Sequence, residues 1–257
     1  MRIALAVELL KMRRSTVVKV ATAILSLLMP VLAAGFMAAY IAGGDSQLTA
    51  KVSTMVTGST WTDYLELMGQ LLSVGALLAV GVVVCWVFGR EFSDATMGSL
   101  YALPISRARI AWAKGLLVLG WGLAASVLAV IVAVPIGLVL GLDGPAGFGD
   151  IAGAVIMPVT VAVLSTLLAL PLALVASAGR GYLPGVGALL GIVAVTQIVT
   201  ILGAGAWFPW AAPGLWSGMG GAELALTVTP VQLSLPVLVG VIGLWATATW
   251  WDRAEVV

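Results

Sequence analysis

Six long runs of apolar residues constrain this chain more than any other feature of its sequence. Each is close to or above the roughly 20 residues with which an α-helix crosses the hydrocarbon of a bilayer. Lipid offers no partner to backbone polar groups, so such runs cross it as helices. We therefore expect an all-α membrane protein with six transmembrane helices. The runs are Val17–Ala42, Leu67–Phe88, Ile110–Leu140, Ile151–Ala178, Leu183–Leu202 and Leu233–Trp250.

The composition excludes several classes of chemistry. Of 257 residues, 61% are apolar and 9% are charged, whereas charged residues make up about a quarter of a soluble protein. There is no histidine, which excludes histidine-ligated haem, histidine-based metal sites and catalytic triads. The lone Cys85 has no intrachain disulfide partner. We expect one membrane domain over residues 1–257, with no metal, no catalytic residue, no bound cofactor and no nucleic-acid partner.

Energy conversion within the chain is also disfavoured. The sequence lacks the G-x-x-x-x-G-K-[ST] loop that cradles nucleotide phosphates, so we expect no ATP hydrolysis by this chain alone. The central parts of the apolar runs lack Asp, Glu, Lys and Arg, residues that ion-coupled carriers use at membrane depth. An intramembrane enzyme is a weak hypothesis for the same reason.

The basic residues predict the orientation. Placing the amino terminus inside puts eleven lysines and arginines on the cytoplasmic side and Lys51 alone outside, in agreement with the positive-inside rule. Both termini are then cytoplasmic, which requires an even number of spans. The eleven are Arg2, Lys11, Arg13, Arg14, Lys19, Arg90, Arg107, Arg109, Lys114, Arg180 and Arg253.

Residues 1–15 mix apolar and basic side chains, which is typical of an amphipathic helix in the membrane interface. The alternative is the start of a signal peptide. The apolar run continues to Ile41, beyond the roughly 7–15 residues of a signal h-region, so we interpret it as a retained first span.

Residues 89–114 form a charged island that includes the segment 89–109 between the second and third runs and Lys114 just beyond it, and we expect the island to face water. Ser93 or Asp94 can cap a short helix that Pro104 ends, and Ser106 can cap the next one. The short helix would offer a partner the apolar stripe of Thr96, Met97, Leu100, Tyr101 and Leu103. An ordinary loop on the lipid headgroups is the alternative.

Residues 203–232 are too rich in glycine and proline for a seventh span. Tryptophan at this density favours the headgroup region, so we expect short re-entrant or surface helices at the outer side. The alternative is a plain loop anchored by aromatic residues. The aromatic residues are Trp207, Phe208, Trp210 and Trp216.

The island resembles the signature of ABC-2 type exporter permeases, the membrane subunits of bacterial ATP-binding cassette exporters. The resemblance rests on Gly89–Met97, then on Leu103 to Arg107 with its Pro-Ile-Ser-Arg run, and on Lys114. Glu8 to Lys11 before the first span, and Phe208-Pro209-Trp210 before the last, are similar to the same family.

This resemblance implies a mechanism. Residues 1–15 would be an elbow helix and residues 89–109 a coupling helix on the cytoplasmic side. Two permease subunits, identical or different, would pair above two ATPase subunits, which bind ATP and Mg²⁺, in the bacterial inner membrane. Three sets of residues would serve this mechanism. The residues that would couple to the ATPase are Arg90, Glu91, Asp94, Met97, Leu100, Tyr101 and Arg107. The residues that would line the pathway are Gln70, Ser73, Gln197 and Thr200. The residues that would form the outer gate are Trp207, Phe208, Trp210 and Trp216.

The leading hypothesis is therefore an exporter permease whose substrate is a peptide, a drug-like molecule or a lipid-like molecule. The alternative is a membrane scaffold or assembly subunit that does not transport and that docks a cytoplasmic partner through residues 89–109. Substrate-dependent stimulation of ATP turnover would distinguish the two.

Overall fold

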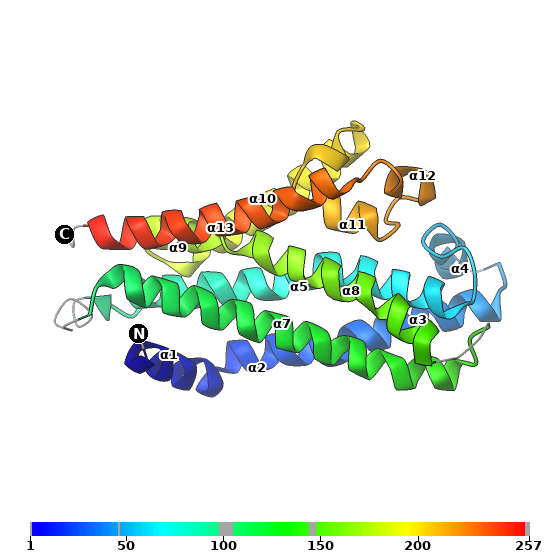
Figure 1. The fold of residues 1–257 in the computed structure, drawn as a ribbon, viewed down its shortest axis with the longest axis horizontal. Coiled ribbons are helices and arrows are strands. Elements are labelled where there is room, and N and C mark those ends of the chain that lie inside the picture. Colours follow the sequence, from blue (N-terminus) through cyan, green and yellow to red (C-terminus); the bar gives the residue numbers. More distant parts are fainter. Residues whose placement is uncertain (1, 46, 98–104, 144–147, 255–257) are drawn as a thin grey trace.

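The computed structural model describes residues 2–45, 47–97, 105–143 and 148–254. Within these residues, six helical segments are long and apolar enough to cross a membrane, which confirms the six predicted spans. They lie side by side as one bundle (Figure 1). Their bounds are Thr16–Ala42 (α2, η1 and α3), Trp61–Ser93 (α5), Arg107–Leu140 (α7), Ile151–Ala178 (most of α8, with α9), Tyr182–Ile201 (α10) and Pro230–Arg253 (α13).

Helix α5 is the centre of the bundle and is longer than predicted at both ends. It begins after Thr60, whose side chain and that of Asp63 form a reciprocal capping box. It continues to Ser93 because the charged residue Glu91 is buried by its neighbours. It packs against α3, α7, α8, α9 and α10.

Two prolines shape the spans that contain them. In the first span, α2 (Thr16–Ala23) and α3 (Met29–Ala42) are joined by a π-helical turn at Ile24–Leu28, immediately before Pro30. In the fourth span, α8 (Phe148–Ala169) gives way to α9 (Leu172–Ala178) at Pro171. Proline has no N–H and clashes with the preceding turn, so helices bend or end there.

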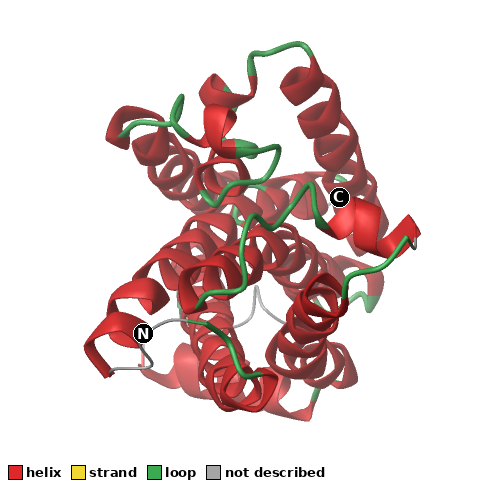
Figure 2. Cartoon of the chain, turned by 90° about the vertical axis from the view of Figure 1, so that its right-hand side faces the viewer, coloured by secondary structure: helices red, strands yellow, loops and turns green. Residues whose placement is uncertain are grey.

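The two ends of the bundle differ. One end holds α1 (Arg2–Arg14) and both chain termini (Figure 1). The other end carries the short elements that link the long helices, and Figure 2 looks onto it. The segment 203–232 forms short helices there, as predicted. The short elements are α4 (Gln47–Val52), η2 (Gly205–Trp207), α11 (Ala212–Trp216) and α12 (Ala222–Ala225).

Glycines at helix contacts set how closely the spans approach. Gly137 abuts the ring of Trp61, and a Cβ there would lie 2.8 Å from it. Gly141 caps the end of α7 in the left-handed conformation with φ +64° and nothing within 4 Å. Gly187 and Gly191 on α10 also have nothing within 4 Å. Of these small residues, Gly137 thus packs the bundle, while Gly187 and Gly191 face open space on α10.

Gly89 is the closest approach of α5 to the start of α10. A Cβ there would lie 2.4 Å from the backbone nitrogen of Tyr182, and backbone atoms have little freedom to yield. We expect Gly89→Ala to lower the free energy of unfolding by about 1–3 kcal/mol, measured by thermal unfolding in detergent. Gly120→Ala is the control, since Gly120 is exposed on α7 with nothing within 4 Å, and it should be neutral or stabilising by up to about 1 kcal/mol. Equal losses in the two variants would contradict this packing.

Candidate functional site

Four charged side chains meet at the end of the bundle that holds the termini. Lys114 donates hydrogen bonds to Glu8 at 2.7 Å and to Glu91 at 2.8 Å. Lys11 donates to the same two carboxylates, at 2.8 Å and 2.9 Å. We call Glu8, Lys11, Glu91 and Lys114 the charge cluster. It joins α1, the last turns of α5 and the first turns of α7.

Every polar atom at the centre of the charge cluster has a partner. The third N–H of Lys114 donates to the carbonyl of Val87 at 3.2 Å, so the three donors of an ammonium group are used. The two oxygens of Glu8 accept from different lysines, Oε1 from Lys11 and Oε2 from Lys114. On Glu91, Oε1 accepts from both lysines, and Oε2 accepts from the Thr96 hydroxyl at 2.6 Å.

Three of the four residues of the charge cluster are shielded from solvent, while the side chain of Lys11 is 29% exposed. Lys114 is 0% exposed, Glu91 2% and Glu8 4%. Removing two charges from water costs several kcal/mol per ion, which only a complete set of partners offsets. Since two carboxylates face two ammonium groups, the formal charge of the charge cluster is zero. The charge cluster therefore persists only while all three helices hold this arrangement.

Lys11 completes the charge cluster from α1. Burial lowers the pKa of Lys11, but the hydrogen bonds and charges of Glu8 and Glu91 outweigh that effect and raise it above the ordinary 10.5. A raised pKa in the folded protein means that the stabilisation is fully present below pH 10.5 and is lost only as the pH rises further. Lys11 is therefore charged throughout the physiological range.

The charge cluster also holds the segment between α5 and α7, residues 94–106, which we call the connector. Thr96 links it to Glu91, and the backbone N–H of Thr96 bonds the Glu91 carbonyl at 3.0 Å. Ala95, between them in the turn, has a positive φ of 53°, which is strained for a residue with a Cβ. At the other end, Ser106 precedes α7 at the predicted N-cap position, but its side chain makes no cap bond.

The structure corrects the expectation that the charged island faces water. Glu91 and Lys114 point into the bundle because each finds its counter-charge there. Met97, predicted to face a partner, is 6% exposed and belongs to the chain's own core. The predicted coupling residues Leu100 and Tyr101, with Leu103 of the apolar stripe, lie outside the described residues.

Arg90 and Asp94 are the predicted coupling residues that remain accessible. They form a loose ion pair of 3.7 Å with side chains 28% and 55% exposed, and Arg90 also lies over the ring of Trp86 at 4.5 Å. Exposed pairs of this kind contribute about 0–1 kcal/mol. Both side chains can thus contact another protein without disturbing the fold.

Arg107 instead joins α7 to the carboxyl end of α13. Its guanidinium donates to the carbonyls of Asp252, at 2.6 Å, and Ala254. A cation at this end is favourable because the carbonyls of a helix carry partial negative charge there. Beside it, the rings of Phe92 and Trp251 meet edge to face at 6.2 Å. These contacts fasten the last span to the end of α5.

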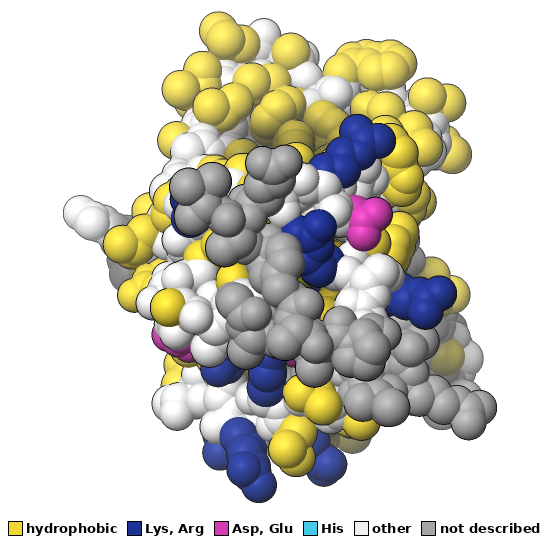
Figure 3. Space-filling model, turned by 90° about the vertical axis from the view of Figure 1, so that its left-hand side faces the viewer, with side chains coloured by type: hydrophobic (Ala, Val, Ile, Leu, Met, Phe, Trp, Pro, Cys, Tyr) yellow, Lys and Arg dark blue, Asp and Glu magenta, His cyan; other side chains and the backbone are white. Residues whose placement is uncertain are grey.

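Basic side chains cover the surface of this same end. Figure 3 looks onto it and shows lysine and arginine side chains scattered over this face, with few acidic groups. The described residues that contribute are Lys11, Arg13, Arg14, Arg90, Arg107, Arg109, Arg180 and Arg253.

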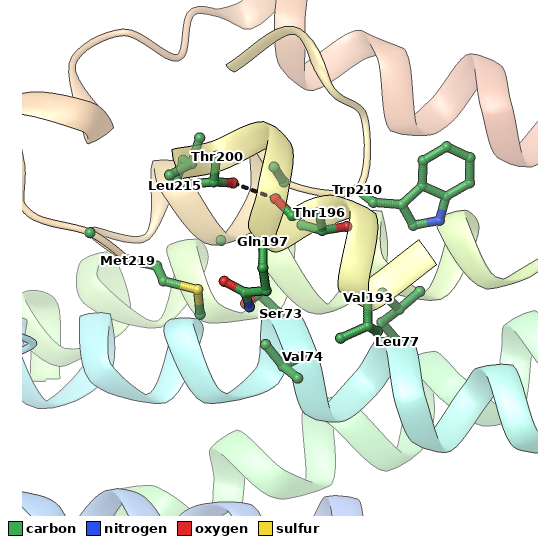
Figure 4. A pocket seen from close by; sticks show the side chains of 13 residues that line it. Ser73, Val74, Leu77, Val193, Thr196, Gln197, Thr200, Trp210, Leu215 and Met219 are labelled. Atoms are coloured by element: carbon green, nitrogen blue, oxygen red, sulfur yellow. Dashed lines mark hydrogen bonds between the residues drawn. The ribbon is translucent and has the colours of Figure 1, made fainter. Parts of the chain in front are cut away.

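Three of the four predicted pathway residues line one cavity. A pocket of about 170 Å³ between α5, α10 and α11 is lined by Ser73, Gln197 and Thr200, and we call it the polar pocket. The amide of Gln197 extends toward Ser73 (Figure 4). Thr200 uses its hydroxyl on the carbonyl of Thr196, at 2.8 Å. The hydroxyls of Ser73, Thr196 and Thr200 donate to backbone carbonyls of their own helices, and the amide of Gln197 is the largest polar side-chain group that lines the pocket.

Gln70 lies outside the polar pocket. It lines a second cavity of about 250 Å³ closer to α4 and α12, which we call the outer cavity. Its Nε2 donates to the carbonyl of Met55 at 3.0 Å. Asp63, Glu66 and Trp216 line the same cavity.

The aromatic residues predicted for the outer gate separate into different environments. Trp207 is 65% exposed. Phe208 and Trp210 contact each other with ring centres 5.4 Å apart. Trp210 donates to the Leu168 carbonyl at 3.1 Å, close to the break at Pro171. Trp210 therefore anchors residues 203–232, which we call the outer segment, to the fourth span. Trp216 borders the outer cavity.

Sequence reasoning identified Glu91 as a site residue but missed its partners Glu8, Lys11 and Lys114. The available signal was that charges of both signs lie beside three different apolar runs at the same predicted side, with Glu8 and Lys11 before the first run, Glu91 after the second and Lys114 in the first turns of the third.

Comparison with known families identifies the family to which most of the chain is similar. The family model described as ABC-2 family transporter protein matches residues 4–203. This range contains the charge cluster, the connector and the first five spans. No curated protein matches the chain.

Proposed function

Because the chain belongs to the ABC-2 family of transporter proteins, we propose that it is the membrane permease of an ATP-binding cassette exporter driven by separate ATPase subunits. The six spans form the membrane part of such a complex. The sequence has no phosphate-binding loop of its own, so two partner ATPases supply ATP and Mg²⁺. The exported substrate is an amphipathic peptide, a drug-like molecule or a lipid-like molecule.

The observation that carries this proposal is the attachment of the connector to the charge cluster. The connector is the contact site for the ATPase. A displacement of it acts on Glu91 through Thr96, and from Glu91 it reaches α1 and α7 through two lysines. Close-packed interiors have low compressibility and transmit strain, so a displacement of the connector reaches both helices.

The two helices that flank the connector serve as levers. Helices α5 and α7 have 33 and 34 residues, or about 50 Å at 1.5 Å per residue, and each reaches from the connector to the opposite end of the bundle (Figure 1). A tilt at the connector therefore moves the far end, where the polar pocket lies between α5 and α10. The polar pocket is part of the proposed translocation pathway.

A second permease subunit pairs with this one through α10. Only 11% of the hydrophobic window of α10 is buried within the chain, against 67% for α5. Gly187 and Gly191 leave space on α10, and small residues at this spacing allow close helix approach. The partner is a second copy or a related chain.

The basic residues at the end that holds the termini determine the orientation of the complex in the membrane. Lysine and arginine gather at the end that holds the termini and the connector (Figure 3), and such an excess favours the cytoplasmic side. In the bacterial inner membrane this orientation presents the connector to the cytoplasmic ATPases. The outer segment then faces the opposite side, where it serves as the outer gate.

The test uses the accessible pair on the connector side. The double variant Arg90→Ala, Asp94→Ala should keep its thermal stability to within about 1 kcal/mol but bind the ATPase subunits at least about tenfold more weakly, because it removes contacts from the docking surface. Binding is measured by titrating purified ATPase onto the chain in lipid nanodiscs. Lys51→Ala, at the other end, is the matched control.

Unchanged ATPase affinity in the double variant would contradict docking at this end. ATPase that binds but whose turnover never responds to any peptide, drug-like or lipid-like compound would support the scaffold alternative.

A further inference from the structure

The outer cavity has a buried oxygen atom that lacks a partner. The amide of Gln70 donates through Nε2 to the carbonyl of Met55, and a carbonyl only accepts, so this contact fixes which way the amide lies. Its Oε1 is then left buried without a hydrogen bond among the described residues, and Gln70 as a whole is 2% exposed. A buried acceptor of this kind costs about 1–3 kcal/mol, so the site favours a donor.

A free carboxylate lies one helical turn away. Glu66 shares a face of α5 with Gln70 at a spacing of four residues, is half-buried, and has no hydrogen bond or ion pair among the described residues. Asp63, which also lines the outer cavity, has its oxygens occupied by Thr57 and Thr60. Glu66 therefore supplies the available charge, and Asp63 adds to the negative potential.

The chemistry of the lining selects a cation. None of its described residues is lysine or arginine. Lys51 on α4 and Glu223 on α12, the nearest charged residues of those helices, are exposed and do not line it. The hydroxyls of Thr54, Thr57 and Ser217 in the lining donate to acceptors of the chain itself. The side-chain oxygens of the lining that no described group occupies are then the Glu66 carboxylate and Gln70 Oε1, which only accept. The indole of Trp216 adds an aromatic wall, which favours cations and apolar groups.

An organic ammonium fits better than a metal ion or water. The described residues contain no group of three or more Asp, Glu, His or Cys that could hold a metal. A volume of about 250 Å³ is several times the roughly 30 Å³ that one water occupies in the liquid. An ammonium group has three N–H donors, enough for Glu66 and Gln70 Oε1 together.

We propose that the outer cavity binds the primary ammonium group of an amphipathic ligand, with Glu66 as counter-charge and Gln70 Oε1 as a hydrogen-bond acceptor. The proposal deepens the export function by naming cationic amphipaths as a substrate class. The proposal rests on the export function in calling the ligand a substrate. The test below measures binding to this chain and not transport, so it does not depend on that function.

The test uses dansylcadaverine, a fluorescent compound with one primary amine, and its N-acetylated, uncharged form. The chain is placed in phosphatidylcholine nanodiscs, which leave both faces accessible, and binding is followed by fluorescence anisotropy. We expect saturable binding of the amine and on the order of tenfold weaker binding of the acetylated form, since a charge-assisted hydrogen bond is lost. Equal affinities of the two probes, or no saturable binding because water alone fills the cavity, would overturn the proposal.

Variants then locate the site. Glu66→Gln and Gln70→Leu should each weaken amine binding about tenfold while the acetylated probe is unaffected. Glu223→Gln, an exposed carboxylate at the same end, should change nothing. Full amine affinity in both cavity variants would place the binding elsewhere, and displacement of the amine by millimolar Mg²⁺ at constant ionic strength would indicate a metal site instead. ATPase coupling plays no part in these measurements, so their failure leaves the exporter proposal standing.

Discussion

Replacing Lys114 by methionine is expected to destabilise the chain by about 3–5 kcal/mol, the cost of leaving a buried charge without its partner. Lys114 is fully buried and binds both carboxylates of the charge cluster. In Lys114→Met, Glu8 and Glu91 would share Lys11 alone, and the buried formal charge would be −1. The measurement is the free energy of unfolding, or the thermal midpoint, in detergent.

Two controls separate charge pairing from the loss of a long side chain. Lys19→Met removes a lysine that is exposed on the first span, and should change stability by no more than about 0.5 kcal/mol. The double variant Glu91→Gln, Lys114→Met restores neutrality and keeps the pair of Glu8 and Lys11. It should recover most of the loss, because removing both members of a buried pair costs far less than removing one. A double variant as unstable as the sum of the two single variants would rule out this pairing.

Replacing Thr96 by valine is expected to uncouple ATP turnover from the membrane part. The Thr96 hydroxyl holds the connector to Glu91 at 2.6 Å, and valine keeps the shape without the hydroxyl. Coupling free energies between sites are about 1–3 kcal/mol, or 5–150-fold, so substrate stimulation of the ATPase should fall at least about fivefold. The assay is ATP hydrolysis by the complex of chain and ATPase subunits purified from the native membrane.

Thr96→Ser keeps the hydroxyl and is the matched control, which should retain stimulation. Thr96 is exposed on the connector, so neither variant should lose more than about 1–2 kcal/mol of stability, the net value of one hydrogen bond. Stimulation that survives in Thr96→Val would show that force bypasses this contact. Met97 is not suited to this test, because it belongs to the chain's own core.

Much of the fold follows from the sequence, because a span is a local property. Twenty apolar residues predict a membrane helix whatever they pack against, and all six spans were predicted. The surface helix before the first span, the N-cap position of Ser106 and the short helices of 203–232 depend on equally local patterns, and each of these segments appears in the structure. Their positions relative to a bilayer stay predictions.

The charge cluster was not predictable in the same way, because it joins residues 80 and 106 positions apart. A charged residue beside an apolar run is expected at the water interface unless another helix supplies a counter-charge. Whether another helix supplies that counter-charge is visible only in the packed bundle. Glu91 was therefore assigned to the surface. Similarly, Ser73 and Thr200, which were predicted to line one pathway, both line the polar pocket. Gln70 instead lines the outer cavity, where its amide donates to the carbonyl of Met55.

In the proposed mechanism, movement passes from the connector, through the charge cluster, to the far ends of the long helices. Its most direct test is the distance between spin labels at Thr62, near the outer end of α5, and Ile201, at the end of α10, measured by pulsed electron resonance in the intact complex. Both positions are exposed, and the buried native Cys85 should not react with the label. A non-hydrolysable ATP analogue should shift this distance by several ångströms, on the scale of helix displacements in conformational switches, in the wild type and in Thr96→Ser but not in Thr96→Val. An equal shift in Thr96→Val, or no shift in the wild type, would contradict it.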